Sequence, residues 1–212
     1  MMSKGGRFGK YGEIKRMSRL RKARPGHSYP TGGGAQETRG TAFQKKKKPE
    51  KSKMTTRPAK GSDVAFIQGL SKLVFSRYGP YEDILSAWFE SDITITLLAF
   101  MKKRPVGFAM LGRHPHECDS NQVAELLAIA VEPTKQKRGV GDFLMNEILG
   151  KARKLRIEIV LLHTALENGP AQRLFIKHMF APSGIKKSFY PKGQDALLMV
   201  NHMKWYDHED VL

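Results

Sequence analysis

The sequence predicts a mixed α/β domain that follows a basic N-terminal segment, and three features of the chain indicate this fold class. A nearly unbroken apolar run at residues 123–131 leads through a glycine-containing turn into an amphipathic repeat at 140–151. A second apolar run, 157–165, leads into another helical repeat at 168–180. Two runs rich in β-forming residues precede both blocks. Strands that alternate with helices predict a sheet covered by helices.

Most of the positive charge lies in the first quarter of the chain. The 212 residues carry a formal net charge of +17, and residues 1–53 hold 16 Lys and Arg against 3 Asp and Glu. Residues 1–52 contain little apolar surface to bury, so we expect a basic, disordered tail. Two roles stay open for it: a solvated, solubilising segment, or an arm that binds phosphates of RNA or of the ribosome surface. We expect the folded domain at 53–205 and a short C-terminal tail at 206–212.

Cysteine usage and hydropathy indicate the compartment. Cys118 is the only cysteine, so no disulfide can form within the chain. The basic N-terminus is not followed by the apolar stretch of a secretory signal, and the longest clearly apolar run, 93–101, is too short to cross a bilayer. We therefore expect a cytoplasmic protein without a membrane span. Residues 114–118 contain two histidines and the cysteine, but the sequence offers no second ligand pair, so we predict a loop and no metal site.

The elements before the first block are predicted from residue type and spacing. They are a strand at 54–58, a helix at 64–78 after the capping residues Ser62 and Asp63, a helix at 81–90, and an antiparallel hairpin of 93–101 with 106–113. The hairpin turn is expected to span 102–105. The chain is expected to close the sheet with strands over 188–199.

The turn after the first apolar run has the composition of a phosphate-binding loop. It reads Gln136-Lys137-Arg138-Gly139-Val140-Gly141, with two glycines and two cations. Glycines allow backbone N–H groups to approach a ligand without a Cβ in the way. These N–H groups lie at the positive end of the helix dipole, which favours a phosphate. Because the spacing differs from the dinucleotide-binding and P-loop motifs, the sequence predicts a diphosphate site of another kind.

These residues carry a resemblance to a known family. Residues 124–133, Ala-Glu-Leu-Leu-Ala-Ile-Ala-Val-Glu-Pro, with the turn that follows, resemble the acetyl-CoA site of the GNAT superfamily of N-acetyltransferases and its pattern Gln/Arg-x-x-Gly-x-Gly/Ala. The second block is similar to the family motif Asn-x-x-Ala-x-x-Leu-Tyr-x-x-x-Gly-Phe, except that Phe175 and Met179 replace the tyrosine and the glycine. The last strands resemble those of the bacterial ribosomal-protein alanine N-acetyltransferases. The resemblance implies a GNAT fold with a twisted mixed sheet of about seven strands, split beside the cosubstrate strand and covered by helices on both faces.

The resemblance also implies how acetyl-CoA is bound. The first strand would bind the acetyl carbonyl and the pantetheine arm, the turn would bind the pyrophosphate mainly through main-chain N–H groups, and Asn168 would contact the cosubstrate from the second block. Phe175 stands where the family has a tyrosine that protonates the leaving thiolate, so the role of acid stays unassigned. A thiol with a pKa near ~8.5 is nevertheless a tolerable leaving group without an acid. The predicted cosubstrate-binding residues are Ile129, Ala130, Val131, Lys137, Arg138, Gly139, Val140, Gly141, Asp142, Asn168 and Phe175.

Three residues are candidates for the chemistry. Glu125 is the first choice for the general base, because histone-type members of the family have their catalytic glutamate at the start of this strand and because apolar neighbours make a carboxylate a better proton acceptor. His163 is the second choice, at the position of a glutamate base in the ribosomal-protein alanine enzymes. Tyr190 is expected at the acceptor mouth and is a candidate proton donor. The early helices would form a wall of the acceptor cleft, with Tyr78, Tyr81, Glu82 and Trp88 as candidates.

The sequence therefore predicts an acetyl-CoA-dependent N-acetyltransferase that acts on a primary amine by direct transfer. A protein N-terminus or lysine is the expected acceptor, and the lower pKa of an α-amino group, near ~7.7–8.0 against ~10.4 for lysine, favours the N-terminus. Two alternatives stay open: a small amine such as a polyamine or aminoglycoside as acceptor, or a catalytically weakened acetyl-CoA-binding protein that docks to RNA or the ribosome through residues 1–52. The oligomeric state also stays open.

Overall fold

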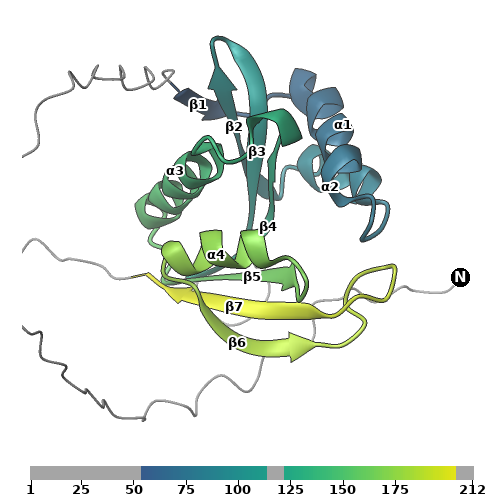
Figure 1. Ribbon diagram of the computed structural model, residues 1–212. Helices are drawn as coiled ribbons and strands as arrows, with labels where there is room; N and C mark the ends of the chain where they lie inside the picture. Colours follow the sequence, from purple (N-terminus) through teal and green to yellow (C-terminus); the bar gives the residue numbers. More distant parts are fainter. Residues whose placement is uncertain (1–53, 114–121, 204–212) are drawn as a thin grey trace, which may run out of the picture. The chain divides into compact units, whose positions relative to one another are not determined.

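A computed structural model describes residues 54–113 and 122–203 of the chain (Figure 1). The described residues form one seven-stranded sheet and four α-helices. The strands are β1 (Met54–Pro58), β2 (Thr94–Met101), β3 (Arg104–Arg113), β4 (Val123–Val131), β5 (Ile159–Ala165), β6 (Ala181–Lys186) and β7 (Ala196–His202). The helices are α1 (Val64–Phe75), α2 (Tyr81–Glu90), α3 (Val140–Lys154) and α4 (Gly169–Lys177). The predicted tails at 1–52 and 206–212, and the cluster at 114–118 for which we predicted no metal site, lie outside the described residues.

The sheet has the strand order β1-β2-β3-β4-β5-β7-β6. All neighbours are antiparallel except β4 and β5, which run parallel. Helices α1 and α2 pack on one face with Phe108 and Met110 of β3, while α3 and α4 pack on the other face with Ala109 and Leu111 (Figure 1). Neighbouring residues of β3 thus face opposite cores, as expected for a strand buried on both sides. The predicted mixed sheet with helices on both faces is confirmed.

Strands β4 and β5 separate halfway along their length. Their pairing runs from Val123 opposite Ile159 to Leu126 opposite Leu162, and β4 then continues to Val131 without a partner in β5. Strand β5 goes on to Ala165 and pairs with β7 on its other side. The second half of β4 therefore turns its backbone groups on this side toward an opening in the sheet. This opening is the split that the sequence predicted.

A β-bulge in β4 sets which side chains face that opening. Met110 of β3 pairs with Ala128, and Leu111 pairs with Leu126, so Leu127 has no partner in β3. A bulge reverses the face to which the following residues point. Ala124 and Leu126 accordingly lie in the core below α3, whereas Ala128 and Ala130 lie in the core below α1 and α2. Glu125, between two residues of the first core, points to the α1–α2 side.

Several predicted boundaries were wrong. The first helix ends at Phe75 rather than Tyr78. The hairpin turn has two residues, Lys102 (φ 48°) and Lys103 (φ 66°), which both adopt left-handed backbone conformations. This is the pattern of a type I′ turn, which suits the twist of the strands despite the lack of glycine. The closing strand begins at Ala196, and β6 was not predicted at all. Among the helices that the structure describes, none has the length and apolar character needed to span a bilayer.

Candidate active site

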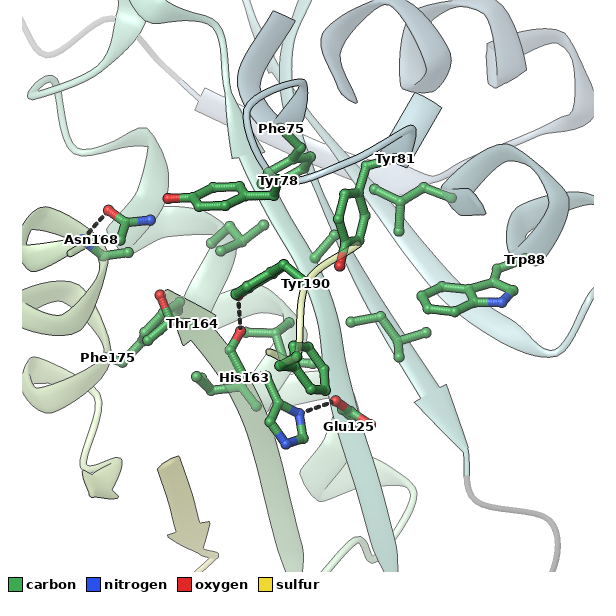
Figure 2. A pocket seen from close by; sticks show the side chains of 18 residues that line it. Phe75, Tyr78, Tyr81, Trp88, Glu125, His163, Thr164, Asn168, Phe175 and Tyr190 are labelled. Atoms are coloured by element: carbon green, nitrogen blue, oxygen red, sulfur yellow. Dashed lines mark hydrogen bonds and ion pairs between the residues drawn. The ribbon is translucent and has the colours of Figure 1, made fainter. Parts of the chain in front are cut away.

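A pocket of about 110 Å³ lies where β4 and β5 separate (Figure 2). Helices α1 and α2, the two separating strands, α4 and the segment before β7 all contribute to its walls. Its lining is mostly aromatic and aliphatic, and among the described residues Glu125 is the one carboxylate in it. The lining residues are Phe75, Tyr78, Tyr81, Leu85, Trp88, Glu125, Leu126, Leu127, Ala128, Ile129, Leu162, His163, Thr164, Asn168, Ala171, Phe175, Phe189 and Tyr190.

The two candidates for the general base lie in contact with each other. The Nδ1 atom of His163 and the Oε1 atom of Glu125 are 2.7 Å apart, a short hydrogen bond between β5 and β4. The side chain of His163 is 4% exposed and that of Glu125 is 12% exposed. The sequence presented them as alternatives, whereas the structure joins them in one pair.

The imidazole of His163 has a ring contact in addition to its hydrogen bond with Glu125. Its ring stacks on that of Phe189, with centroids 4.4 Å apart and planes inclined by 16°. Its other nitrogen, Nε2, is buried and has no hydrogen-bond partner among the described residues. A buried nitrogen cannot take a proton from a group in the pocket. Of the two candidates, the geometry therefore favours Glu125 as the group that would take the proton. His163 would orient the Glu125 carboxylate.

Tyr190 occupies the middle of the aromatic lining. Its ring lies 4.8 Å from that of Tyr78 and 6.1 Å from that of Tyr81, between centroids, and its hydroxyl donates a long 3.4 Å hydrogen bond to the carbonyl oxygen of His163. Burial raises the pKa of Tyr190 well above its ordinary value. The phenol is therefore neutral at physiological pH, suited to donating a hydrogen bond and poorly suited to giving up its proton to a thiolate.

The predicted phosphate-binding loop has the backbone of an anion site. Lys137 (φ 57°) and Gly139 (φ 82°) adopt left-handed conformations directly before α3, and Nε2 of Gln136 donates to the carbonyl oxygen of Val131 over 3.1 Å. The first N–H groups of α3 have no acceptor within the helix, so they are available to a ligand. Gly141 has a packing role as well: a Cβ there would lie 3.2 Å from Cδ2 of Leu174 in α4.

Asp142, in the first turn of α3, links this loop to the end of α4. One carboxylate oxygen accepts from Nζ of Lys177 at 2.8 Å, and the other contacts Nε2 of His178 at 3.1 Å. The hydrogen bond from Lys177, against a smaller opposing effect of burial, lowers the pKa of Asp142. Its carboxylate is thus engaged within the protein, and only its main-chain N–H remains as a candidate contact for pyrophosphate.

The remaining predicted residues lie along the path between loop and pocket. Ile129, Ala130 and Val131 lie in the half of β4 that pairs with β3 but has no partner in β5. Asn168 caps α4, with Oδ1 accepting from the N–H of Ala171 at 3.3 Å, and lines the pocket. Phe175 is 4% exposed, contacts Phe180 edge to face and also lines the pocket, without a hydroxyl to offer.

The structure adds residues that sequence reasoning missed. Phe75, Leu85, Leu127 and Phe189 line the pocket, whereas Glu82, a candidate for the cleft wall, does not. The helical spacing of Leu85 indicates only that it faces inward, and Phe189 stands next to Tyr190 in an aromatic pair that could have drawn attention to both. Leu127 could not have been found, since its place depends on the bulge. The described residues contain no cluster of three or more metal-binding side chains.

A family model described as the acetyltransferase (GNAT) family matches residues 65–180, which is more than half of the chain. The chain belongs to this family. The matched residues include α1 to α4 and the separating strands, so they hold the loop and most of the pocket. Membership agrees with the predicted enzyme class, an N-acetyltransferase, and with acetyl-CoA as the predicted cosubstrate of the family.

Individual relatives are more distant. A proposed ribosomal protein bS18-alanine N-acetyltransferase of Bacillus subtilis is 30% identical over 77 residues, which are 36% of this chain and 51% of that protein. This chain therefore matches about half the length of that curated relative. The solved ribosomal-protein-S18-alanine N-acetyltransferase of Escherichia coli has a TM-score of 0.63 at 18% identity, with 74% of this chain and 98% of that chain covered. A proposed acetyltransferase from Salmonella typhimurium, solved with acetyl-CoA, has a TM-score of 0.61 at 19% identity, with 75% and 99% covered. At this identity the solved structures show the fold.

Proposed function

We propose that this GNAT protein transfers the acetyl group of acetyl-CoA to an amino group of a protein, with Glu125 as general base. The observation that carries the proposal is the Glu125–His163 pair at 2.7 Å, in a pocket lined mostly by aromatic and aliphatic side chains, at the point where β4 loses its partner in β5. A carboxylate oriented by an imidazole in such a place is suited to accept a proton from an amine. The curated relative, named for acetylation of a ribosomal protein, supports a protein acceptor.

The residues of this chain fit acetyl-CoA at both of its ends. The left-handed backbone at Lys137 and Gly139 and the free N–H groups of α3 form an anion cradle for pyrophosphate. Val131 lies six residue steps along β4 from Glu125, so an extended arm beside this half of the strand spans roughly 20 Å, from the loop to the pocket. Backbone groups between Ile129 and Val131 that face the opening, where β4 has no partner in β5, would hydrogen-bond that arm. Asn168 would flank its thioester end.

The proposed reaction follows from these positions. Acetyl-CoA supplies the acetyl group as a thioester whose sulfur leaves as a thiolate. Glu125 takes one proton from the acceptor ammonium, so that the neutral nitrogen can form its bond to the acetyl carbon. As the carbon–sulfur bond breaks, the nitrogen gives up a second proton to water or to the departing thiolate, which leaves a neutral amide. His163 Nδ1–H holds the accepting carboxylate in place. Backbone N–H groups of β4 beyond Leu126 would donate to the carbonyl oxygen as it becomes negative.

The matched pair Glu125→Gln and Glu158→Gln tests the proposal. Glu158 is an exposed glutamate just before β5, so its variant controls for the loss of a carboxylate near the strands. We expect Glu125→Gln to lower kcat by about 10²–10⁴-fold on a peptide amine with the affinity for acetyl-CoA unchanged, since only the base is lost. Glu158→Gln should retain its turnover. Turnover of Glu125→Gln within threefold of wild type would refute the base assignment, and absence of acetyl-CoA binding by calorimetry would refute the function.

We also propose that residues 1–52 are an accessory arm of a catalytic domain at 53–205, and that the arm brings the enzyme to an RNA-containing acceptor such as the ribosome. Its excess of Lys and Arg supports this role, because cations that neutralise phosphates bind with a strong salt dependence. Deletion of 1–52 should reduce ribosome co-sedimentation and leave turnover on short peptides intact. Co-sedimentation of the truncated chain equal to that of the full chain would remove this role.

A further inference from the structure

The pocket has two chemically different ends (Figure 2). In that view Asn168 and Phe175 lie at one end and Trp88 lies at the other, with Tyr190, His163 and Glu125 between them. The first end belongs to α4 and adjoins the predicted path of acetyl-CoA. The other end belongs to α2, and it is the one that remains for the acceptor.

The acceptor end is built from large aromatic and aliphatic side chains that carry no charge. Tyr81, Leu85 and Trp88 come from successive turns of α2, and Leu127 faces them from the bulge in β4. Gly112 of β3 leaves the space that Leu127 uses, because a Cβ at Gly112 would lie 2.7 Å from its Cδ1 atom. In the part of the chain that the structure describes, no carboxylate other than Glu125 lines the pocket. The acceptor end of the pocket therefore offers mainly hydrophobic contacts to a ligand.

An α-amino group brings its own side chain close to the base. In a polypeptide N-terminus the side chain is attached to the same carbon as the amine. An amine in contact with Glu125 must therefore place that side chain against the wall of Tyr81, Leu85, Trp88 and Leu127. The whole pocket, with the end near α4 included, has a volume of about 110 Å³, so only part of it is available to an aliphatic side chain. A small side chain would make few contacts with this wall, and a charged side chain would lose its hydration there without gaining a partner.

We propose that the acceptor is the N-terminal amine of a polypeptide whose first residue is large and apolar, such as methionine or leucine. The inference rests on the proposed acetyl transfer and specifies its substrate class. A polyamine or aminoglycoside is disfavoured, because each carries several ammonium groups and the pocket presents one carboxylate. A lysine side chain brings apolar methylenes but no branch at the carbon that carries the amine, so it leaves the α2 wall less completely filled.

Peptides that differ only in their first residue test the substrate class. Wild-type enzyme is assayed on Met, Leu, Ala, Ser and Asp peptides, on an N-terminally blocked lysine peptide and on spermidine. We expect kcat/KM to be at least about tenfold higher for Met and Leu than for Ala, the size of discrimination that a few methylenes supply in an apolar pocket. Higher kcat/KM on Ala, Ser, Asp, lysine or spermidine than on Met and Leu overturns the inference but leaves acetyl transfer standing. No turnover of any acceptor, with or without acetyl-CoA binding, overturns the inference and the proposed function together.

Variants of Trp88 test whether the side chains of α2 cause the preference for a large apolar first residue. We expect Trp88→Ala to reduce the ratio of kcat/KM for Met over Ala toward one, and Trp88→Phe to retain most of it. Glu90→Ala, at the exposed end of the same helix, is the matched control and should keep the full ratio. Thermal melting of each variant separates loss of preference from loss of fold. A folded Trp88→Ala enzyme with an unchanged ratio overturns the inference, even if wild type prefers Met.

Discussion

The Glu125–His163 pair shows how far residue identity alone determines a site. Each residue stood out in the sequence, one as a strand-end glutamate and the other as a strand histidine, and each was a candidate for the same role. Their contact depends on the register of β4 and β5, in which Leu126 opposite Leu162 is the last pair before the strands separate. The periodicity of a sequence indicates which residues share a face of a strand, but it does not indicate which residues of two strands lie opposite each other. The pair could therefore be predicted as two candidates and not as one unit.

Replacement of His163 distinguishes a positioning role from a structural one. Asparagine places an N–H donor near the position of Nδ1, whereas alanine removes the donor and the ring that stacks on Phe189. We expect His163→Ala to lower kcat by about 10–100-fold with little change in KM for acetyl-CoA, and His163→Asn to recover a large part of that loss. Steady-state kinetics of both variants at matched pH check this. Equal losses in the two variants would indicate that His163 serves packing alone.

Phe175 and Tyr190 together define what happens to the leaving thiolate. Phe175 has no proton to give, and the burial that raises the pKa of Tyr190 makes its phenol a weak acid. A thiolate with a conjugate acid near ~8.5 leaves without help more readily than an alkoxide. We therefore expect Phe175→Tyr, which adds a hydroxyl at the pocket wall, to raise kcat by less than about tenfold, against the 10²–10⁴ that an essential acid supplies. A hundredfold gain measured in the same assay would show that departure of the thiolate limits the native enzyme.

At the scale of elements, the strands and helices with strong periodicity were predicted and the weakly patterned ones were not. Strands β1 and β4 and helix α2 have the predicted bounds. Strand β6 contains Pro182, Ser183 and Gly184, and its residues are almost all exposed at the edge of the sheet. Such an edge strand shows neither alternation nor β-forming residues, because only its pairing with β7 makes it a strand.

The contact of Asp142 with Lys177 and His178 joins the phosphate-binding end of α3 to the end of α4 and gives a pH-dependent contribution to stability. Because the folded pKa of Asp142 is lowered, the unfolded chain takes up the proton first as the pH falls. The contribution is therefore complete at neutral pH and is lost as the pH falls below the ordinary value of 3.8. We expect Asp142→Asn to destabilise the protein by about 0.5–1 kcal/mol at pH 7, the range for a pair still open to solvent.

Urea unfolding at several pH values measures this difference. The difference in unfolding free energy between wild type and Asp142→Asn should narrow as the pH falls from 5 to 3. The control is Asp83→Asn, which removes an exposed carboxylate in the first turn of α2, and its difference from wild type should not narrow in this way. A gap that stays constant over this range would assign the effect of Asp142→Asn to helix capping or packing.

At the scale of the whole molecule, binding of acetyl-CoA is the property from which the other proposals follow. A ligand that binds only the folded state stabilises it by about 2.7 kcal/mol at a hundred times its Kd. For a domain of this size we expect the Tm to rise by roughly 5–10 °C. Thermal melting with acetyl-CoA, and with pantetheine as a matched ligand that lacks the pyrophosphate, checks both the binding and the role of the loop. Equal shifts with the two ligands would contradict the loop as the pyrophosphate site.

The separation of β4 from β5 divides the sheet into two panels. One panel contains β1 to β4 and the other contains β5, β7 and β6, and only the residue pairs from Val123–Ile159 to Leu126–Leu162 join them by strand pairing. The proposed base, Glu125, is contributed by one panel and its histidine partner by the other. A small rotation of one panel against the other would lengthen the hydrogen bond between Glu125 and His163. The geometry of the proposed proton transfer therefore depends on how rigidly the short pairing of β4 with β5 joins the two panels.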